Sequence, residues 1–174
     1  MRPRFSLAKR KAEELLRAAN IDSAPVPVEQ LAQIAGASVQ YEPFNGPVSG
    51  LMHRNADGSV VIGVNSSHPE TRQRFTIAHE LGHVVLHRDE QFHIDETASI
   101  RFRDEESSRA TSSDEIEANQ FAAELLMPAH FVSEEIEKLP GGTAPEDAIP
   151  VLAERFQVSE QALTLRLNRL HLLL

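Results

Sequence analysis

The sequence contains no cysteine, and this absence limits the chemistry available to the protein. Without thiols the chain can form neither a disulfide nor a cysteine-ligated zinc site, and it has no thiol nucleophile. Any metal site must use histidine and carboxylate ligands, which favours a catalytic over a structural zinc. Tryptophan is also absent and aromatic residues make up only 5% of the chain, so we expect a core of Leu, Ile, Val and Ala.

Long apolar runs and an excess of positive charge are missing as well. No stretch approaches the roughly 18 consecutive apolar residues of a transmembrane helix, and the basic residues 1–10 lack the apolar segment of a signal peptide. We therefore expect a cytoplasmic protein with no membrane partner. The formal net charge of −9 argues against general nucleic-acid binding by the whole chain.

Hydrophobic patterning in the 174 residues predicts an α+β fold, in which a small β-sheet packs on a central helix over residues 68–87. A polar stretch, residues 89–113, interrupts the pattern, with a possible short strand at 99–103. We divide the chain into a main α+β domain, residues 1–140, and a helical C-terminal extension, residues 141–174. The other expected elements are helices over 5–19, 28–35, 114–127 and 129–139, two helices within 145–174 with Ser159 as a cap between them, and strands over 37–41, 50–53 and 59–64.

The most informative segment is His79-Glu80-Leu81-Gly82-His83, on the predicted central helix. Residues four apart on an α-helix lie on one face, so His79 and His83 can direct ring nitrogens at one metal ion. Glu80 lies off their stripe and is free to act as a general base on a metal-bound water. The pattern is typical of a zinc hydrolase, although a surface helix with solvated His and Glu would also produce it.

A catalytic zinc site usually has three protein ligands and a water, so the chain must supply a third ligand. His87 shares the helical stripe, but it lies eight residues after His79, about 12 Å along the helix axis. The spacing also fails the extended pattern H-E-x-x-H-x-x-G-x-x-H. We therefore expect His87 to support the ligand histidines or to end the helix, where the helix dipole favours it.

The predicted helix over residues 114–127 offers two glutamates as a third ligand. Glu115 and Asn119 share a face, so Glu115 can bind the metal while Asn119 hydrogen-bonds a ligand histidine. Glu117 lies about 200° away from Glu115 around the helix and cannot easily share that role. Both carboxylates could equally be solvated charges near a helix N-terminus.

Two blocks of sequence resemble the ImmA/IrrE family of metallo-endopeptidases, a gluzincin-like group of zinc proteases. The first block is residues 75–87, FTIAHELGHVVLH, and the second is residues 115–128, EIEANQFAAELLMP. They occur in the family's order, and shorter stretches at 60–65 and 102–108 are also similar. The resemblance covers most of residues 7–139.

This resemblance implies a fold, a metal site and a substrate class. The fold is zincin-like, with His79, His83 and Glu115 as metal ligands, Glu80 as the catalytic carboxylate and Glu117 as the less suitable ligand. The metal is zinc, although Mn²⁺ or another divalent ion can occupy such a site. The implied substrate is a helix-turn-helix transcriptional repressor, cleaved within a stress-response or mobile-element switch.

Two features of the reaction remain open at the level of sequence. A further donor to the developing oxyanion is expected, and His93, Tyr41, His53 and Arg103 are candidates. The strand over residues 60–64 could be a sheet edge that holds a peptide substrate as an added strand. It could equally be an interior strand with both edges paired.

Two other classes of function compete with an endopeptidase. Residues 152–170 have the helix, turn, helix pattern of a DNA reader, with Arg166, Asn168 and Arg169 on the second helix. Residues 141–174 lack a basic excess, however, so we favour a helical pair packed on the catalytic domain over direct DNA binding. A non-proteolytic regulator with a structural metal is disfavoured by Glu80, because such a site needs no general base.

Overall fold

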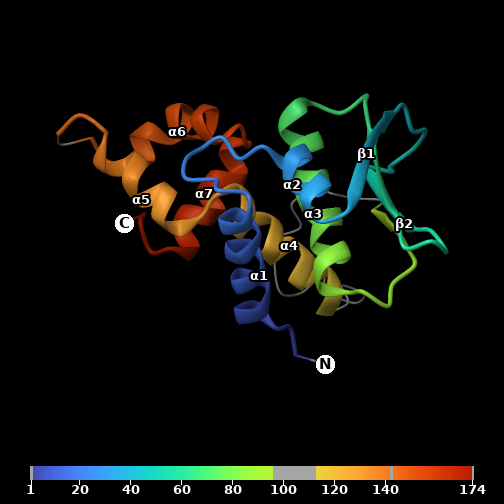
Figure 1. The fold of residues 1–174 in the computed structure, drawn as a ribbon. Helices are drawn as coiled ribbons and strands as arrows, with labels where there is room; N and C mark the ends of the chain where they lie inside the picture. The colour runs from blue at the N-terminus through green and yellow to red at the C-terminus, as the bar shows by residue number, and fades with distance from the viewer. Residues whose placement is uncertain (1, 96–112, 142, 174) are drawn as a thin grey trace.

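The structure, a computed structural model, describes residues 2–95, 113–141 and 143–173. In chain order it runs from two helices into a small sheet, then through a long central helix to a helical C-terminal half (Figure 1). The elements are α1 (Phe5–Ala18), α2 (Val28–Ile34), β1 (Ala37–Glu42), β2 (Gly50–Arg54), β3 (Val60–Asn65), α3 (Glu70–Leu86), β4 (Phe92–Asp95), α4 (Ser113–Leu126), α5 (Ala129–Glu137), the 3₁₀ helix η1 (Pro145–Ala148), α6 (Ile149–Phe156) and α7 (Glu160–Arg169).

The four strands form one mixed sheet in the order β1-β3-β2-β4. β3 pairs in parallel with β1 and antiparallel with β2, while β2 pairs antiparallel with β4. β3 is therefore an interior strand, so of the two alternatives that the sequence left open, the structure shows the interior strand and not an edge that could receive a peptide. Buried and exposed residues do not alternate along β3, because both faces of this strand are largely covered by the protein.

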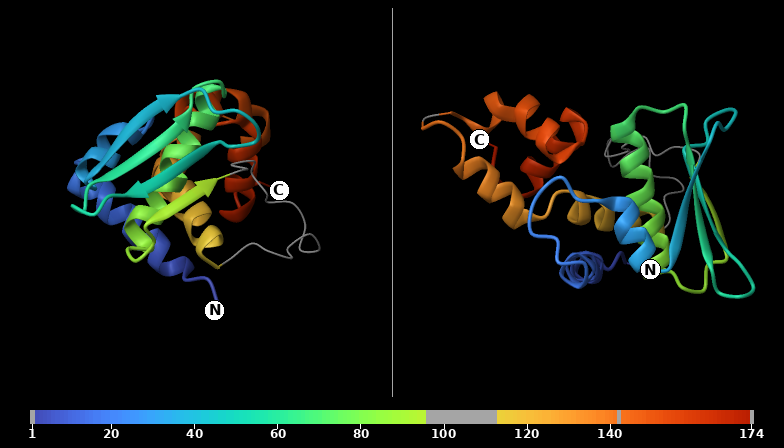
Figure 2. Two further views of the ribbon diagram at one scale, coloured as in Figure 1. Left: turned by 90° about the vertical axis from the view of Figure 1, so that its right-hand side faces the viewer. Right: turned by 45° about the horizontal axis from the view of Figure 1, so that its top comes forward.

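Helix α3 lies between this sheet and the helices α1 and α4, as both views of Figure 2 show. Residues 74–84 are all buried, so the helix is covered on every side rather than on one stripe. From the sheet, Met52, Ile62 and Val64 are fully buried in the same core. Polar residues in this part of α3 therefore lie in a water-poor setting, where an unsatisfied polar group costs free energy.

A glycine sets the close approach of α3 to α4. A Cβ atom added to Gly82 would lie 3.0 Å from the Cα atom of Ala118 and 3.2 Å from its carbonyl oxygen. Any side chain at position 82 would therefore push the two helix backbones apart. Because Gly82 lies between His79 and His83, this contact brings the N-terminal half of α4 to the same level as the two histidines.

The C-terminal helices pack on α4 and share the main core. Buried Leu152, Phe156, Leu163 and Leu167 belong to one hydrophobic cluster with residues of α1, α3 and α4. The Ser159 hydroxyl accepts a hydrogen bond from the backbone N–H of Ala162 at 3.1 Å and so caps α7, as predicted. The division of the chain at residue 140 stays a prediction.

The α+β fold class predicted from the sequence is confirmed. One strand differs from expectation, because β4 lies at 92–95 within the stretch that we interpreted as irregular. The alternation Phe92-His93-Ile94-Asp95 is the signal for it, although four residues are few for such a pattern. The short strand expected at 99–103 lies outside the described residues. Among the helices that are described, none is long and apolar enough to cross a membrane.

Candidate metal centre

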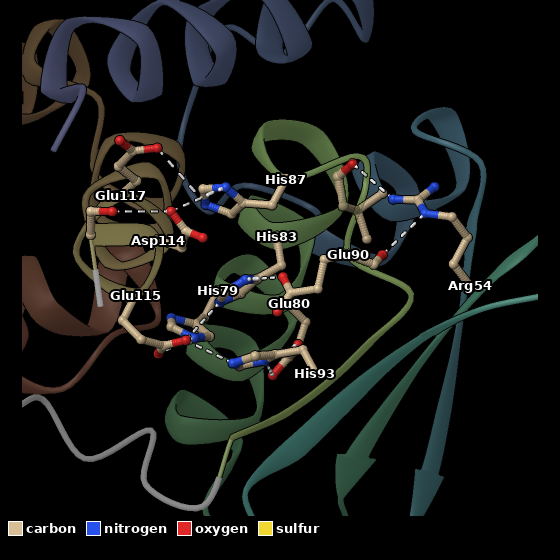
Figure 3. A network of polar contacts seen from close by, with 12 residues as sticks. Arg54, His79, Glu80, His83, His87, Glu90, His93, Asp114, Glu115 and Glu117 are labelled. Atoms are coloured by element: carbon tan, nitrogen blue, oxygen red, sulfur yellow. Dashed lines mark hydrogen bonds and ion pairs between the residues drawn. The ribbon is translucent and has the colours of Figure 1, made fainter. Parts of the chain in front are cut away.

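His79 and His83 lie one turn apart on α3, with ring centroids 5.0 Å apart (Figure 3). His79 is 2% exposed and His83 is fully buried. The Nε2 atoms of both rings are buried and have no hydrogen-bond partner among the described residues. Buried polar atoms in proteins nearly always have a partner, so two such nitrogens side by side indicate a missing ligand.

The other nitrogen of each ring has an acceptor that fixes its protonation. His79 Nδ1 lies 3.2 Å from Asn119 Oδ1, and His83 Nδ1 lies 2.8 Å from Glu90 Oε2. Amide and carboxylate oxygens accept hydrogen bonds, so each Nδ1 carries the proton and donates. In the neutral ring Nε2 then presents a lone pair, which is the form in which histidine binds a metal.

Glu115 comes from the first turn of α4 and faces both free nitrogens. Its Oε2 lies 3.4 Å from His79 Nε2, and its Oε1 lies 3.3 Å from His83 Nε2. Two ligand atoms that each lie about 2.0–2.1 Å from one tetrahedral ion are separated by about 3.3–3.4 Å. The three side chains therefore fit a single zinc-sized ion between them.

The electrostatics of the same group favour an ionised carboxylate. Burial opposes ionisation of Glu115, but the imidazoles of His79, His83 and His93 outweigh it and hold the pKa of the carboxyl below its ordinary value. Burial likewise lowers the pKa of His83, but the nearby carboxylates of Glu115 and Glu90 outweigh burial and raise this pKa to about 9. A divalent cation placed here would meet a negative charge already formed.

Glu80 and His93 lie beside this group. Glu80 is fully buried, and its two carboxylate oxygens lie 3.3 Å and 3.0 Å from Nδ1 of His93, on β4. The opposite nitrogen, His93 Nε2, lies 2.7 Å from Glu115 Oε1, and the His93 ring stacks on His83 at 3.8 Å. Burial lowers the pKa of His93, but the two carboxylates raise it to about 10. The ring therefore bridges the predicted base and the predicted third ligand.

Glu117 does not face His79 and His83. Both of its oxygens accept hydrogen bonds from Arg4, with Oε1 at 2.6 Å from the Arg4 backbone nitrogen and Oε2 at 2.7 Å from Nη2. This follows from the helical geometry, which turns Glu117 away from the face that carries Glu115. Of the two glutamates that the sequence offered, the structure brings only Glu115 to the histidines.

The remaining predicted site residues are placed elsewhere. His87 ends α3 as its C-terminal cap and lies next to His83, with ring centroids 5.3 Å apart. Tyr41 lies on β1, at the opposite edge of the sheet from β4, and its hydroxyl donates to Glu29 Oε1 at 2.6 Å. The structure therefore does not bring Tyr41 to the site as an oxyanion donor. His53 is exposed and contacts Phe92, and Arg103 lies outside the described residues.

Two acidic residues near the site were not predicted. Glu90 follows α3 and bonds His83, although nothing in the sequence marks it among the other acids of residues 89–113. Asp95, at the end of β4, is 5% exposed and offers a carboxylate oxygen within 4.8 Å of ligand atoms of His79 and Glu80. The alternation of β4 could have indicated that His93 and Asp95 point to the same side.

Of the two arginines that suggested a DNA-reading helix, Arg166 points into the protein, whereas Arg169 is exposed. Arg166 is 3% exposed and bonds Glu124, with Nη1–Oε1 and Nη2–Oε2 distances of 3.0 Å and 2.5 Å, and its Nε donates to the Met127 carbonyl at 2.9 Å. Arg169 Nη1 donates to Gln120 Oε1 at 2.8 Å. These side chains hold α7 on α4, and a buried arginine cannot contact base edges in a DNA groove.

Comparison with known proteins places this site in a family. Residues 32–168 match the peptidase family described as IrrE N-terminal-like domain. The chain is 37% identical over 100 residues to the radiation response metalloprotease IrrE of Deinococcus radiodurans, a match that covers 57% of this chain and 28% of that protein. It is 36% identical over 73 residues to the uncharacterized immunity region protein 2 of Bacillus phage phi105, covering 42% of this chain and 41% of the phage protein.

Among solved structures, a Mycobacterium tuberculosis transcriptional regulator matches with a TM-score of 0.57 and 17% identity, over 89% of this chain and 44% of that one. At this identity the likeness concerns the fold alone. The chain thus spans less than half the length of each of these relatives. The family match covers most of the chain and includes both blocks that carry the candidate metal ligands, so the protein belongs to the IrrE N-terminal-like family of metallopeptidases, the ImmA/IrrE family that its motifs resemble.

Proposed function

We propose that the protein is a zinc-dependent endopeptidase that hydrolyses a peptide bond in a helix-turn-helix transcriptional repressor. The observation that carries the proposal is the pair of buried, unpartnered Nε2 atoms of His79 and His83, with the Glu115 carboxylate 3.3–3.4 Å from both. His79, His83 and Glu115 are the proposed metal ligands. Zinc suits two imidazoles and a carboxylate, and Mn²⁺ or another divalent ion is the alternative that metal analysis decides.

A bound divalent metal would polarise the scissile carbonyl and make water more acidic, which is the chemistry that peptide hydrolysis at neutral pH requires. Glu80 is the residue that we propose takes the proton from the attacking water and returns it to the leaving amine. It lies off the ligand stripe, is fully buried and is oriented by His93. Exclusion of water around its carboxylate strengthens its electrostatic interactions with the reacting groups.

His93, one of the four candidates that the sequence offered, is the proposed donor to the developing oxyanion. Its ring nitrogens lie 3.0 Å from Glu80 and 2.7 Å from Glu115, so the proposed donor is beside the proposed metal ligands. To donate to the carbonyl oxygen of a substrate, one ring N–H would exchange its carboxylate partner for that oxygen. The bond to Nδ1 keeps Glu80 turned toward the centre.

The sheet offers a place for the substrate at β4 rather than at β3. Among the described residues β4 pairs with β2 alone, and it carries His93 next to the metal centre. An extended peptide that added to this strand would pass the ligand histidines. We propose a repressor as the source of that peptide because the family resemblance implies one, and because one relative is named for a radiation response and another for a phage immunity region.

The test combines metal analysis with detection of cleavage. Purified wild-type protein should hold one equivalent of tightly bound zinc, which Glu115→Ala loses and Glu117→Ala keeps. Glu80→Gln should keep the zinc and lose about 10²–10⁴-fold in activity, because general acid–base catalysis contributes that much. Activity is measured as new peptide termini in cells that express wild-type protein but not in cells that express Glu80→Gln.

The His93→Gln variant separates two roles for that ring. If His93 donates to the oxyanion, the variant should keep its zinc and lose activity. If His93 is instead a fourth metal ligand, the variant should lose zinc. Tightly bound zinc that survives in Glu115→Ala would reject the ligand assignment. Cleavage that continues in Glu80→Gln would reject the peptidase mechanism and favour a non-proteolytic regulator.

A further inference from the structure

A second group of histidine and carboxylates lies one helical turn beyond the proposed metal ligands. His87, at the C-terminal end of α3, faces Asp114 and Glu117 from the first turns of α4 (Figure 3). Ligand atoms of the three side chains all lie within 4.8 Å of one another. None of the three is a proposed ligand of the first ion, so the two groups share no residue.

The His87 side chain is only 7% exposed, yet it makes no hydrogen bond among the described residues. Its Nε2 lies 3.9 Å from Glu117 Oε2, its Nδ1 lies 3.8 Å from Asp114 Oδ1, and Nε2 is buried without a partner. These distances are too long for hydrogen bonds. They are close to the separation of two ligands that bind one ion, about 3.3–3.4 Å, so small movements would bring them together around a cation.

Arg4 already neutralises part of this group. Its guanidinium Nη2 donates to Glu117 Oε2 at 2.7 Å, and its Nε lies 3.0 Å from Glu117 Oε1. A carboxylate oxygen has two lone pairs, so Glu117 Oε2 can accept from Arg4 and still bind a cation. Counting Asp114 and Glu117 against Arg4, the group keeps one net negative charge when His87 is neutral.

We propose that His87, Asp114 and Glu117 form a second divalent-cation site, which takes zinc more weakly than the first. One imidazole and two carboxylates are a donor set that zinc accepts. Two features weaken the site: the Asp114 side chain is 53% exposed, and the positive charge of Arg4 opposes a second cation at Glu117. The proposal does not depend on peptidase activity, since it concerns different ligands.

The experiment is a zinc titration of the full chain after removal of metal with a chelator, with bound zinc measured by equilibrium dialysis and elemental analysis. Wild-type protein should bind two equivalents in two steps. His87→Gln should bind only the tight one, and Glu115→Ala only the weak one. His130→Gln, which changes an exposed histidine outside both groups, should bind two. Circular dichroism of the metal-free variants confirms that each is folded.

Arg4→Gln tests the shared carboxylate independently of His87. Removal of the opposing charge should tighten the weak step about tenfold and leave the tight step unchanged. A wild type that binds one equivalent at saturating zinc, held by Glu115, would overturn the proposal, as would two equivalents in His87→Gln. A single equivalent that depends on His87 and not on Glu115 would instead support this site and reject the first.

Discussion

The two ends of α4 use carboxylates in opposite ways. Near its C-terminal end, Glu124 is matched by the forked guanidinium of Arg166, which bonds both carboxylate oxygens and also the Met127 carbonyl. Near its N-terminal end, Glu115 faces the imidazole rings of His79 and His83 instead. The Nε2 atoms of these two rings have no hydrogen-bond partner among the described residues. The carboxylate at the C-terminal end is matched by an arginine, whereas the one at the N-terminal end belongs to the candidate metal centre.

This difference separates a structural ion pair from a metal centre. Arginine is permanently charged and fits a carboxylate with two parallel hydrogen bonds, so the pair needs nothing further. Histidine near neutral pH can present a lone pair, and a group of such rings around a carboxylate remains incomplete without a metal. Burial and proximity of opposite charges alone would not distinguish the two ends. The Nε2 atoms of His79 and His83, which have no hydrogen-bond partner among the described residues, distinguish them.

The largest effect on stability is expected at the satisfied end. Arg166→Met should lower the free energy of unfolding by about 3–5 kcal/mol, because it leaves Glu124 as a buried charge without its partner. The zinc stoichiometry should not change. Unfolding in urea, with zinc analysis of the folded variant, measures both.

Two controls sharpen this result. Arg155→Met removes an arginine that is 42% exposed and pairs with Glu135, and it should cost less than about 1 kcal/mol. The double variant Arg166→Met, Glu124→Leu should regain much of the loss, because no charge is then left buried. A single variant as stable as wild type would show that the two ends of α4 do not differ in this way.

At the incomplete end, the opposite result is expected. Asn119→Ala removes the acceptor that fixes His79 Nδ1, and it should weaken zinc binding by about 10–100-fold. The metal-free protein should lose less stability than Arg166→Met does, about 1–3 kcal/mol, because only one neutral hydrogen bond to the buried His79 ring is removed. Asn168→Ala on the exposed face of α7 is the matched control. Equal zinc affinity in wild type and Asn119→Ala would remove Asn119 from the support of the site.

Gly82→Ala acts on the contact that sets α4 against α3. A methyl group 3.0 Å from the Ala118 backbone must move one helix, at a typical cost of about 1–3 kcal/mol, which exceeds the gain of up to about 1 kcal/mol in helix propensity. The displacement should also weaken zinc binding, since it moves Glu115 from the histidines. Gly141→Ala, with nothing within 4 Å, should do neither. Stability equal to wild type would show that the backbones have room to spare.

Much of the metal centre could be predicted from sequence because it depends on helical periodicity. The spacing of His79 and His83 fixes their common face, and the spacing of Glu115 and Asn119 fixes another, whatever the rest of the chain does. The sequence alone left Glu115 and Glu117 open, and the resemblance favoured Glu115. The structure shows how they differ, since Glu115 faces His79 and His83 whereas Glu117 is turned toward Arg4.

The parts that could not be predicted depend on contacts between distant segments. His93 reaches Glu80 only because β4 adds to the sheet beside β2, and a four-residue strand in a polar stretch gives a weak signal. Glu90 bonds His83 from just beyond the end of α3, where helical spacing no longer applies. The position of Tyr41 could not be predicted for the same reason. It lies at the far edge of the sheet because of the order of the strands, which the local sequence pattern does not reveal.

The smallest effect is expected at Tyr41, which tests whether the far edge of the sheet is independent of the metal centre. Partial desolvation and the hydrogen bond to Glu29 raise the pKa of its phenol above the ordinary value of 10.0. A raised pKa means that the folded protein favours the protonated phenol. The contribution of Tyr41 to the free energy of unfolding is therefore complete below about pH 10 and is lost as pH rises through the pKa of the folded state. The ultraviolet absorbance of the phenolate reports it directly, because the chain has one tyrosine and no tryptophan.

Glu29→Gln should lower the pKa of Tyr41 without returning it to the ordinary value, because desolvation is the larger cause and remains. Tyr41→Phe should leave zinc binding and cleavage unchanged, since the hydroxyl contacts Glu29 at the edge of the sheet opposite His93. Loss of cleavage in Tyr41→Phe with zinc retained would return this residue to the list of oxyanion donors. It would also mean that the sheet brings β1 to the substrate as well as β4.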